Sequence, residues 1–209
     1  MRRFVCALGL LCFSVVMVAQ SATVLRVSFD REGVPVPHWE MRLAADGSGV
    51  FESRPATDAP VSREVRLSPK NWARMQRLLA ASNHLVPCES ESKNLARIGI
   101  KTVEWTAADG AVARCSFNYT DNKALSQLAE IWVGMAATLD EARRITQLHK
   151  HDRLGLDKEL ADYQHAVDQG FAAEPGLIEP ELRALVEDEM VMQRVRVRAQ
   201  RLLEKQGRN

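Results

Sequence analysis

The chain has 209 residues, of which 46% are hydrophobic and 26% are charged. This composition is typical of a globular protein and excludes a chain that is disordered throughout. With 28 basic and 27 acidic residues the formal charge is only +1, so no overall attraction draws the protein to nucleic acid or anionic lipid. We therefore expect no nucleic-acid partner.

Residues 1–22 have the pattern of a cleavable signal peptide. Two arginines follow the initiator methionine, and the apolar run over residues 4–19 is shorter than the roughly 20 residues that cross a bilayer as a helix. Small residues between Ala19 and Ala22 fit the cleavage site. The sequence predicts an exported protein, periplasmic or extracellular, with no stable membrane span after cleavage.

Two cysteines, Cys88 and Cys115, remain once the leader is removed. An even pair in an exported protein predicts a disulfide. The alternative is a reactive thiol, but the chain has no Cys-x-x-Cys spacing and no obvious activating base beside either residue.

The first half of the mature chain is rich in strand patterns. Apolar and polar residues alternate over 25–29 and 39–43, and the turn sequence 46–49 leads into a returning strand. A further strand is predicted over 64–67. Turns this short allow only antiparallel pairing.

A second hairpin is predicted from residues 98–105 and 112–119, joined by an Asp-Gly turn. We expect its inward face to hold Cys115, Phe117 and Tyr119.

Two amphipathic helices accompany these strands. Ser68 and the proline that follows are typical of a helix start, and apolar residues at helical spacing continue to about Ser82. The second helix is expected from Asp121 through Leu139, with a restart or continuation toward His149. The order strands, helix, hairpin, helix resembles two β-rich units, each closed by a helix. Residues 23–139 are predicted to form an α+β domain with one disulfide, its antiparallel hairpins making a sheet covered by two helices.

Residues 140–209 show no strand pattern and are predicted to form a C-terminal helical segment that ends in a helical hairpin. One helix is expected over 156–168 and one or two over 180–206. On a helical wheel the apolar residues of 182–186 and those of 192–203 point in different directions. We therefore predict a break between Glu187 and Val191, or two different packing partners.

The tail separates its charges. Arg194, Arg198, Arg201 and Lys205 are basic, whereas the segment before them is acidic. One interpretation is that the oppositely charged helices pair with each other as an antiparallel hairpin. The other is that the four basic residues form a contact face for another envelope or extracellular protein.

Part of this tail resembles a HEAT repeat. Valines and arginines alternate over 195–198, two leucines follow at 202–203, and Asp188 precedes them in the linker, as in the second helix of such a repeat. HEAT proteins are α-solenoids that bind other proteins. The resemblance covers about 20 residues, and the chain shows no second copy at repeat spacing.

The sequence lacks the common catalytic motifs, so it gives little support to an enzyme. The chain has no nucleophile motif and no glycine-rich phosphate loop. The string from His149 to Asp152 is interpreted as a solvated helix end. We predict a non-catalytic protein without cofactor or metal that binds a partner. The alternative is a small exported hydrolase, for which His84 with Glu89 or Glu91 is the best candidate group.

Overall fold

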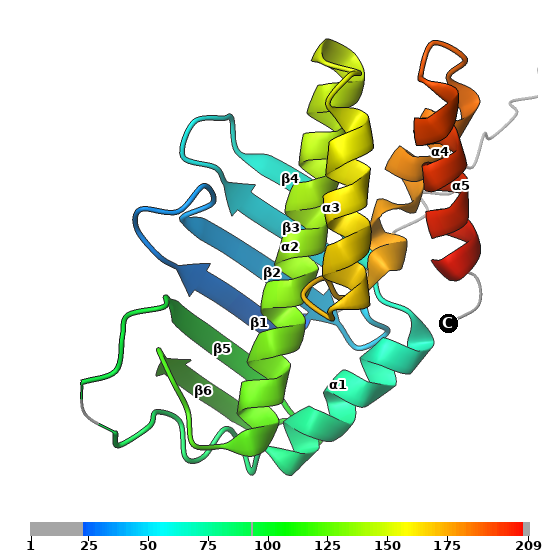
Figure 1. The fold of residues 1–209 in the computed structure, drawn as a ribbon. Coiled ribbons are helices and arrows are strands. Elements are labelled where there is room, and N and C mark those ends of the chain that lie inside the picture. Colours follow the sequence, from blue (N-terminus) through cyan, green and yellow to red (C-terminus); the bar gives the residue numbers. More distant parts are fainter. Residues whose placement is uncertain (1–22, 93, 207–209) are drawn as a thin grey trace, which may run out of the picture.

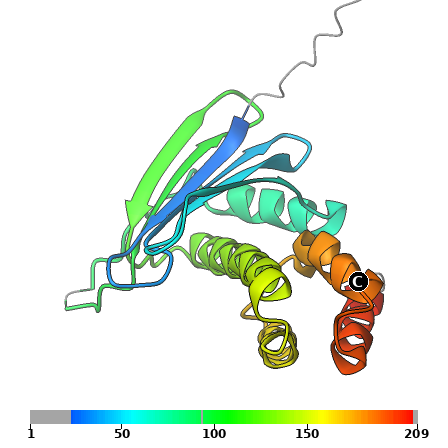
Figure 2. The same cartoon turned by 90° about the horizontal axis from the view of Figure 1, so that it is seen from above.

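The computed structural model describes residues 23–92 and 94–206. The signal peptide predicted over 1–22 lies outside the described residues. The sequence prediction of an α+β fold is confirmed: a six-stranded antiparallel sheet carries helices on one face, and a helical hairpin ends the described chain (Figures 1 and 2).

The sheet has the strand order β4-β3-β2-β1-β5-β6. Its first four strands form a meander, and the β5–β6 hairpin joins the other side of β1, where Val27 lies opposite Val103. The two predicted β-rich units therefore form one continuous sheet. The strands are β1 Thr23–Asp30, β2 His38–Ala44, β3 Ser48–Arg54, β4 Val61–Arg66, β5 Ile100–Thr106 and β6 Val112–Phe117.

The turn between β2 and β3 follows the glycines of the sequence. Gly47 has a φ of 76°, a conformation that glycine adopts without steric cost. A Cβ atom on Gly49 would lie 1.9 Å from the carbonyl oxygen of Arg42, so this strand pair could not close with a larger residue.

Helices α1 (Pro69–Ala81) and α2 (Lys123–His151) cover one face of the sheet. Ser68 caps α1, as predicted, since its hydroxyl accepts a hydrogen bond from the amide of Asn71. The buried stripes of both helices meet the inward strand residues in a single core. Its helical members include Trp72, Met75, Leu79, Leu125, Leu128 and Trp132.

The β5–β6 hairpin differs from the prediction at its end. Cys115 and Phe117 face the core as expected, but β6 ends at Phe117, and Tyr119 lies half-buried in the loop that leads to α2. The strand ends here because the chain turns toward the cap of α2 at Asn122.

The tail contains α3 (Leu156–Asp168), the short 3-10 helix η1 (Pro175–Ile178), α4 (Glu179–Glu187) and α5 (Gln193–Gln206). The break predicted between Glu187 and Val191 is confirmed, because α4 ends at Glu187 and α5 begins only at Gln193. These helices and the end of α2 form a second core. The first core reaches Leu139 and the second begins at Ala142, so the two meet inside the unbroken helix α2.

Two carboxylates attach the tail to the sheet and α1, of which Glu174 is buried and Glu181 is partly buried. Glu181 accepts two hydrogen bonds from Arg63 of β4, at 2.6 and 3.0 Å. Glu174 accepts one from the backbone amide of Ser68 at 2.9 Å and another from the side chain of Asn71, so it reinforces the start of α1. Charge-assisted contacts of this kind fix how the tail sits against the first core.

The opposite face of the sheet is polar and is crossed by a row of ion pairs. Glu40 of β2 contacts Arg26 of β1 and Arg42 of its own strand, each at 2.8 Å, and Arg42 also contacts Glu52 of β3. Burial opposes ionisation of Glu40, but the hydrogen bonds from both arginines outweigh it and lower the pKa of this carboxyl. No helix among the described residues covers this face.

Within the described part of the chain, none of the helices combines the length and apolar character that a bilayer span requires.

Candidate binding groove

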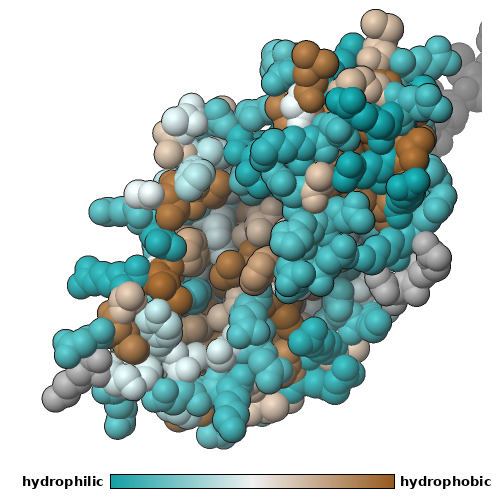
Figure 3. All heavy atoms as spheres, viewed as in Figure 1, coloured by the Kyte–Doolittle hydropathy of each residue, from teal (hydrophilic) through white to brown (hydrophobic). Residues whose placement is uncertain are grey.

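A groove of about 630 Å³ opens between the end of β6, helix α2 and the loop that follows α3. Its lining includes Lys101, Phe117, Asn118, Ala129, Val133 and Phe171. In the view of Figure 1, Figure 3 shows hydrophobic side chains gathered in a hollow to the left of α2. The volume falls in the range of small-molecule sites, which are concave and mainly apolar with a few polar groups. We call this feature the Lys101 groove.

Lys101 is the charged group at the base of this groove. It occupies an inward position on β5, opposite Phe117 of β6, and only 5% of it is exposed. Its ammonium group donates hydrogen bonds to the carbonyl oxygens of Asn118, at 2.9 Å, and Gly99, at 3.2 Å. The same ammonium lies 5.6 Å from the centre of the Phe117 ring.

No carboxylate of the described residues forms an ion pair with Lys101. Burial therefore acts without an opposing charge, and it lowers the pKa of Lys101. A buried cation with only neutral partners costs folding free energy. That cost makes this lysine the clearest candidate for a ligand-binding group.

Apolar side chains at the rim remain in contact with solvent. Phe171 is 71% exposed, Val133 41% and Ile98 38%, and all three line the groove. Single exposed apolar residues are ordinary, but a group of them around one hollow is typical of a binding surface.

A second, polar hollow of about 760 Å³ lies next to the groove and shares Asn118 and Tyr119 with it. Charged residues of both signs line it, among them Arg31, Glu89 and Arg97. The mixture gives this hollow no single charge preference.

The residues proposed for hydrolase chemistry do not come together. His84 is exposed, and its ring packs near Trp105, with ring centres 5.9 Å apart. Glu89 and Glu91 are also exposed, and none of the hydrogen bonds among the described residues joins either of them to His84. A general acid or base needs such contacts with its partner or its substrate, so this group gives the hydrolase no support.

The basic residues of α5 make ion pairs with α3. Arg194 and Arg198 both approach Asp157, at 3.0 and 3.5 Å, and Lys205 pairs with Asp168. The helices of the tail therefore do pair by charge, although the acidic partner of α5 in these contacts is α3. Arg201 is exposed beside them. A protein partner for the four basic residues stays a prediction.

The string from His149 to Asp152 ends α2, as the interpretation of a helix end requires. His149 makes a 2.8 Å contact with Asp188, which Arg153 also approaches at 3.2 Å. Among the described residues, no three side chains of histidine, cysteine, aspartate or glutamate gather as metal ligands would.

One further titratable cluster lies between α2 and α3. Glu141 is only 4% exposed, and it accepts a 2.7 Å hydrogen bond from Arg144, which also contacts Glu159 at 3.2 Å. Burial raises the pKa of Glu141 to about 8, because the cost of burying the carboxylate outweighs the attraction of the Arg144 charge. The nearby Glu159 carboxylate raises the pKa further. The folded protein therefore binds a proton that the unfolded chain releases above its own pKa of 4.5.

We expect Glu141→Gln to be more stable than the wild type by at least about 1–2 kcal/mol at pH 8, since even one unit of the rise in the pKa of Glu141 corresponds to about 1.4 kcal/mol. Because the raised pKa makes stability fall as pH rises from 4.5 toward 8, the two proteins should converge near pH 5. Urea unfolding at pH 5, 6.5 and 8 measures this difference. Glu130→Gln, at an exposed site on the same helix, is the control and should not change the pH profile. An equal gap at all three pH values would contradict the assignment.

The fold and the groove together define an α+β protein with one covered sheet face and a small-molecule-sized hollow beside the central helix. No protein-family model matches the chain. No curated protein matches its sequence at a significant level either, so the groove has to be interpreted from its own residues.

Proposed function

We propose that this chain is an exported, non-catalytic binding protein whose ligand occupies the Lys101 groove. The observation that carries the proposal is a buried ammonium group at the base of an apolar hollow, with no carboxylate partner in the described part of the chain. Export is supported by the leader pattern of residues 1–22 and by the pair Cys88 and Cys115, whose sulfur atoms are bonded.

A purely structural role for Lys101 is the competing explanation. Its two hydrogen bonds connect the carbonyls of Gly99 and Asn118, which lie on either side of the β5–β6 hairpin. A neutral donor could make such contacts without the cost of burying a charge. A structural role for Lys101 also does not explain why the apolar side chains of Val133 and Phe171 are exposed at the rim, whereas a bound ligand would cover them.

The test uses Nile red, a neutral dye that fluoresces in apolar surroundings, so its binding does not depend on the charge of Lys101. The variant Val133→Glu places a carboxylate on the wall of the groove and should weaken dye binding about tenfold or more. Val197→Glu is the matched control, since Val197 is 42% exposed and Val133 41%, and both lie on helices. It should bind the dye as the wild type does.

Circular dichroism and thermal unfolding of all three proteins show whether each variant is folded. Equal dye binding by the wild type and Val133→Glu, both folded, would reject the groove as the binding site.

A further inference from the structure

We propose that the ligand of the groove is a molecule with a single carboxylate head and an apolar body, of which a long-chain fatty acid is the simplest example, and that its carboxylate contacts Lys101. This inference rests on the proposed function and goes one step further, because it names the chemical class of the ligand.

The first argument is charge. An ammonium group has three N–H donors, and Lys101 uses two of them on the carbonyls of Gly99 and Asn118. The third donor has no hydrogen-bond partner among the described residues, and beside the Phe117 ring the positive charge meets no carboxylate there. A carboxylate that accepts the third hydrogen bond would neutralise this charge in a place from which water is largely excluded, where such contacts are strong.

The second argument concerns the number of charges on the ligand. Lys101 is the one cation among the described residues that line the groove, and Glu130 lines it as well. A phosphate dianion is held in proteins by several donors or by the paired N–H groups of arginine. A single ammonium with a carboxylate nearby fits a ligand with one negative charge better.

The third argument concerns the rest of the ligand. Two of the polar side chains in the lining already have partners within the protein. Asn118 accepts a hydrogen bond from the amide of Ile98 and donates one to the carbonyl of Ala96. Thr120 donates to the carbonyl of Pro87 and accepts from the amide of Asn122. A peptide would bring further amides that need partners, whereas an alkyl chain needs only the apolar walls of Ala129, Val133 and Phe171.

The experiment measures displacement of Nile red from the purified protein by four probes at pH 7. They are hexadecanoate, hexadecanol, hexadecyl phosphate and a short apolar peptide with a free C-terminus. We expect hexadecanoate to bind about tenfold or more tightly than hexadecanol, and more tightly than the phosphate or the peptide.

The variant Lys101→Met keeps the length of the side chain and removes its charge. It should bind hexadecanol as the wild type does and bind hexadecanoate no more tightly than the alcohol. Lys101→Gln, which keeps a hydrogen-bond donor, is the second variant and should lose the same preference. The comparison of hexadecanoate with hexadecanol on the wild type needs no variant, so it stands even if neither substitution folds.

The two proposals can fail separately. If Val133→Glu weakens dye binding but the wild type holds hexadecanol, the phosphate or the peptide as tightly as hexadecanoate, the groove is a binding site and the carboxylate inference is overturned. A carboxylate preference that persists in folded Lys101→Met overturns it as well. If Val133→Glu and Val197→Glu are both folded and both bind the dye and hexadecanoate as the wild type does, both proposals are wrong.

Discussion

Replacing Cys88 and Cys115 by serine is expected to lower the free energy of unfolding by about 3–4 kcal/mol. The two residues are 27 positions apart in the sequence and their Cα atoms lie 5.6 Å apart. Without the bond, the unfolded chain regains the freedom of the loop between them, and the longer the loop, the larger this gain in entropy.

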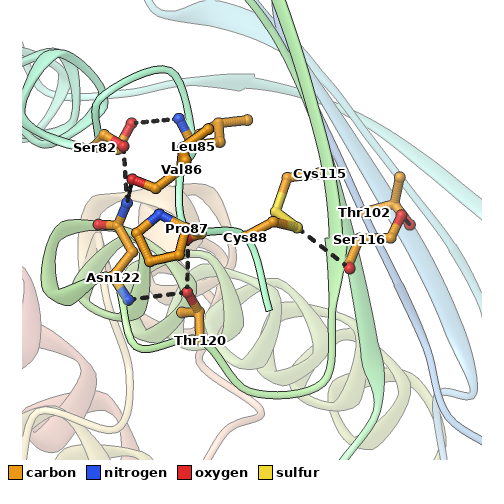
Figure 4. The surroundings of a disulfide bond; sticks show 10 residues. All are labelled: Ser82, Leu85, Val86, Pro87, Cys88, Thr102, Cys115, Ser116, Thr120 and Asn122. Carbon is orange, nitrogen blue, oxygen red and sulfur yellow. Dashed lines mark hydrogen bonds between the residues drawn. A yellow bond between two sulfur atoms is a disulfide. The ribbon is translucent and has the colours of Figure 1, made fainter. Parts of the chain in front are cut away.

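The position of the disulfide is a second reason to expect a loss of stability. It ties the segment that follows α1 to β6, an edge strand of the sheet (Figure 4). Cys115 is buried in the first core, so its replacement also brings a hydroxyl group among apolar neighbours. Urea unfolding of the double variant and of the wild type with and without dithiothreitol measures the effect. The double variant should be somewhat less stable than the reduced wild type, because only the variant places a hydroxyl group in the core, and dithiothreitol should not change the variant. A loss below about 1 kcal/mol would contradict the chain-entropy account.

Much of the fold follows from local patterns in the sequence. The cap at Ser68, the strand alternation of β1 and β2 and the break before Gln193 are all properties of neighbouring residues, and each is found as predicted. The bonding of Cys88 to Cys115 could also be predicted, because the chain beyond the predicted leader contains only these two cysteines.

The candidate site could not be predicted in the same way. Lys101 occupies an inward position in the alternation with Val103 and Trp105, and this parity is the one signal that could have singled it out. Lysine is rarely buried, so its place in a strand is ordinarily assigned to the solvent side. The groove also needs α2 and the loop that carries Phe171, which lie far along the chain.

The partners in the ion pairs of the tail could not be predicted from the sequence either. Both α3 and α4 are acidic, so charge alone does not decide which of them receives the arginines of α5. Packing decides it: α5 lies against both helices, with Asp157 of α3 beside Arg194, whereas Glu181 of α4 pairs with Arg63 of the sheet. The choice depends on how the second core is assembled and is therefore a tertiary property.

After the disulfide, Asn122 is the position where we expect substitution to lower stability most, because its side chain joins three segments. It is 9% exposed. Its amide oxygen accepts a hydrogen bond from Leu125 and caps α2, and its amide nitrogen donates to the carbonyls of Ser82, at 2.8 Å, and Val86, at 3.1 Å (Figure 4). The start of α2 is thus bonded to the end of α1 and to the segment that leads to the disulfide.

We expect Asn122→Ala to lower the free energy of unfolding by about 2–4 kcal/mol, since it removes a cap and leaves the carbonyls of Ser82 and Val86 without this partner. Asn122→Ser can restore the cap but not both donations, so it should recover about 1 kcal/mol of that loss. Asn122→Asp keeps the acceptor and turns a carboxylate oxygen toward the two carbonyls, and should be at least as damaging as alanine at pH 7. Chemical denaturation of the three variants separates these contributions. If serine matched the wild type, the capping bond alone would account for the stability of the site, and the contacts with Ser82 and Val86 would contribute nothing.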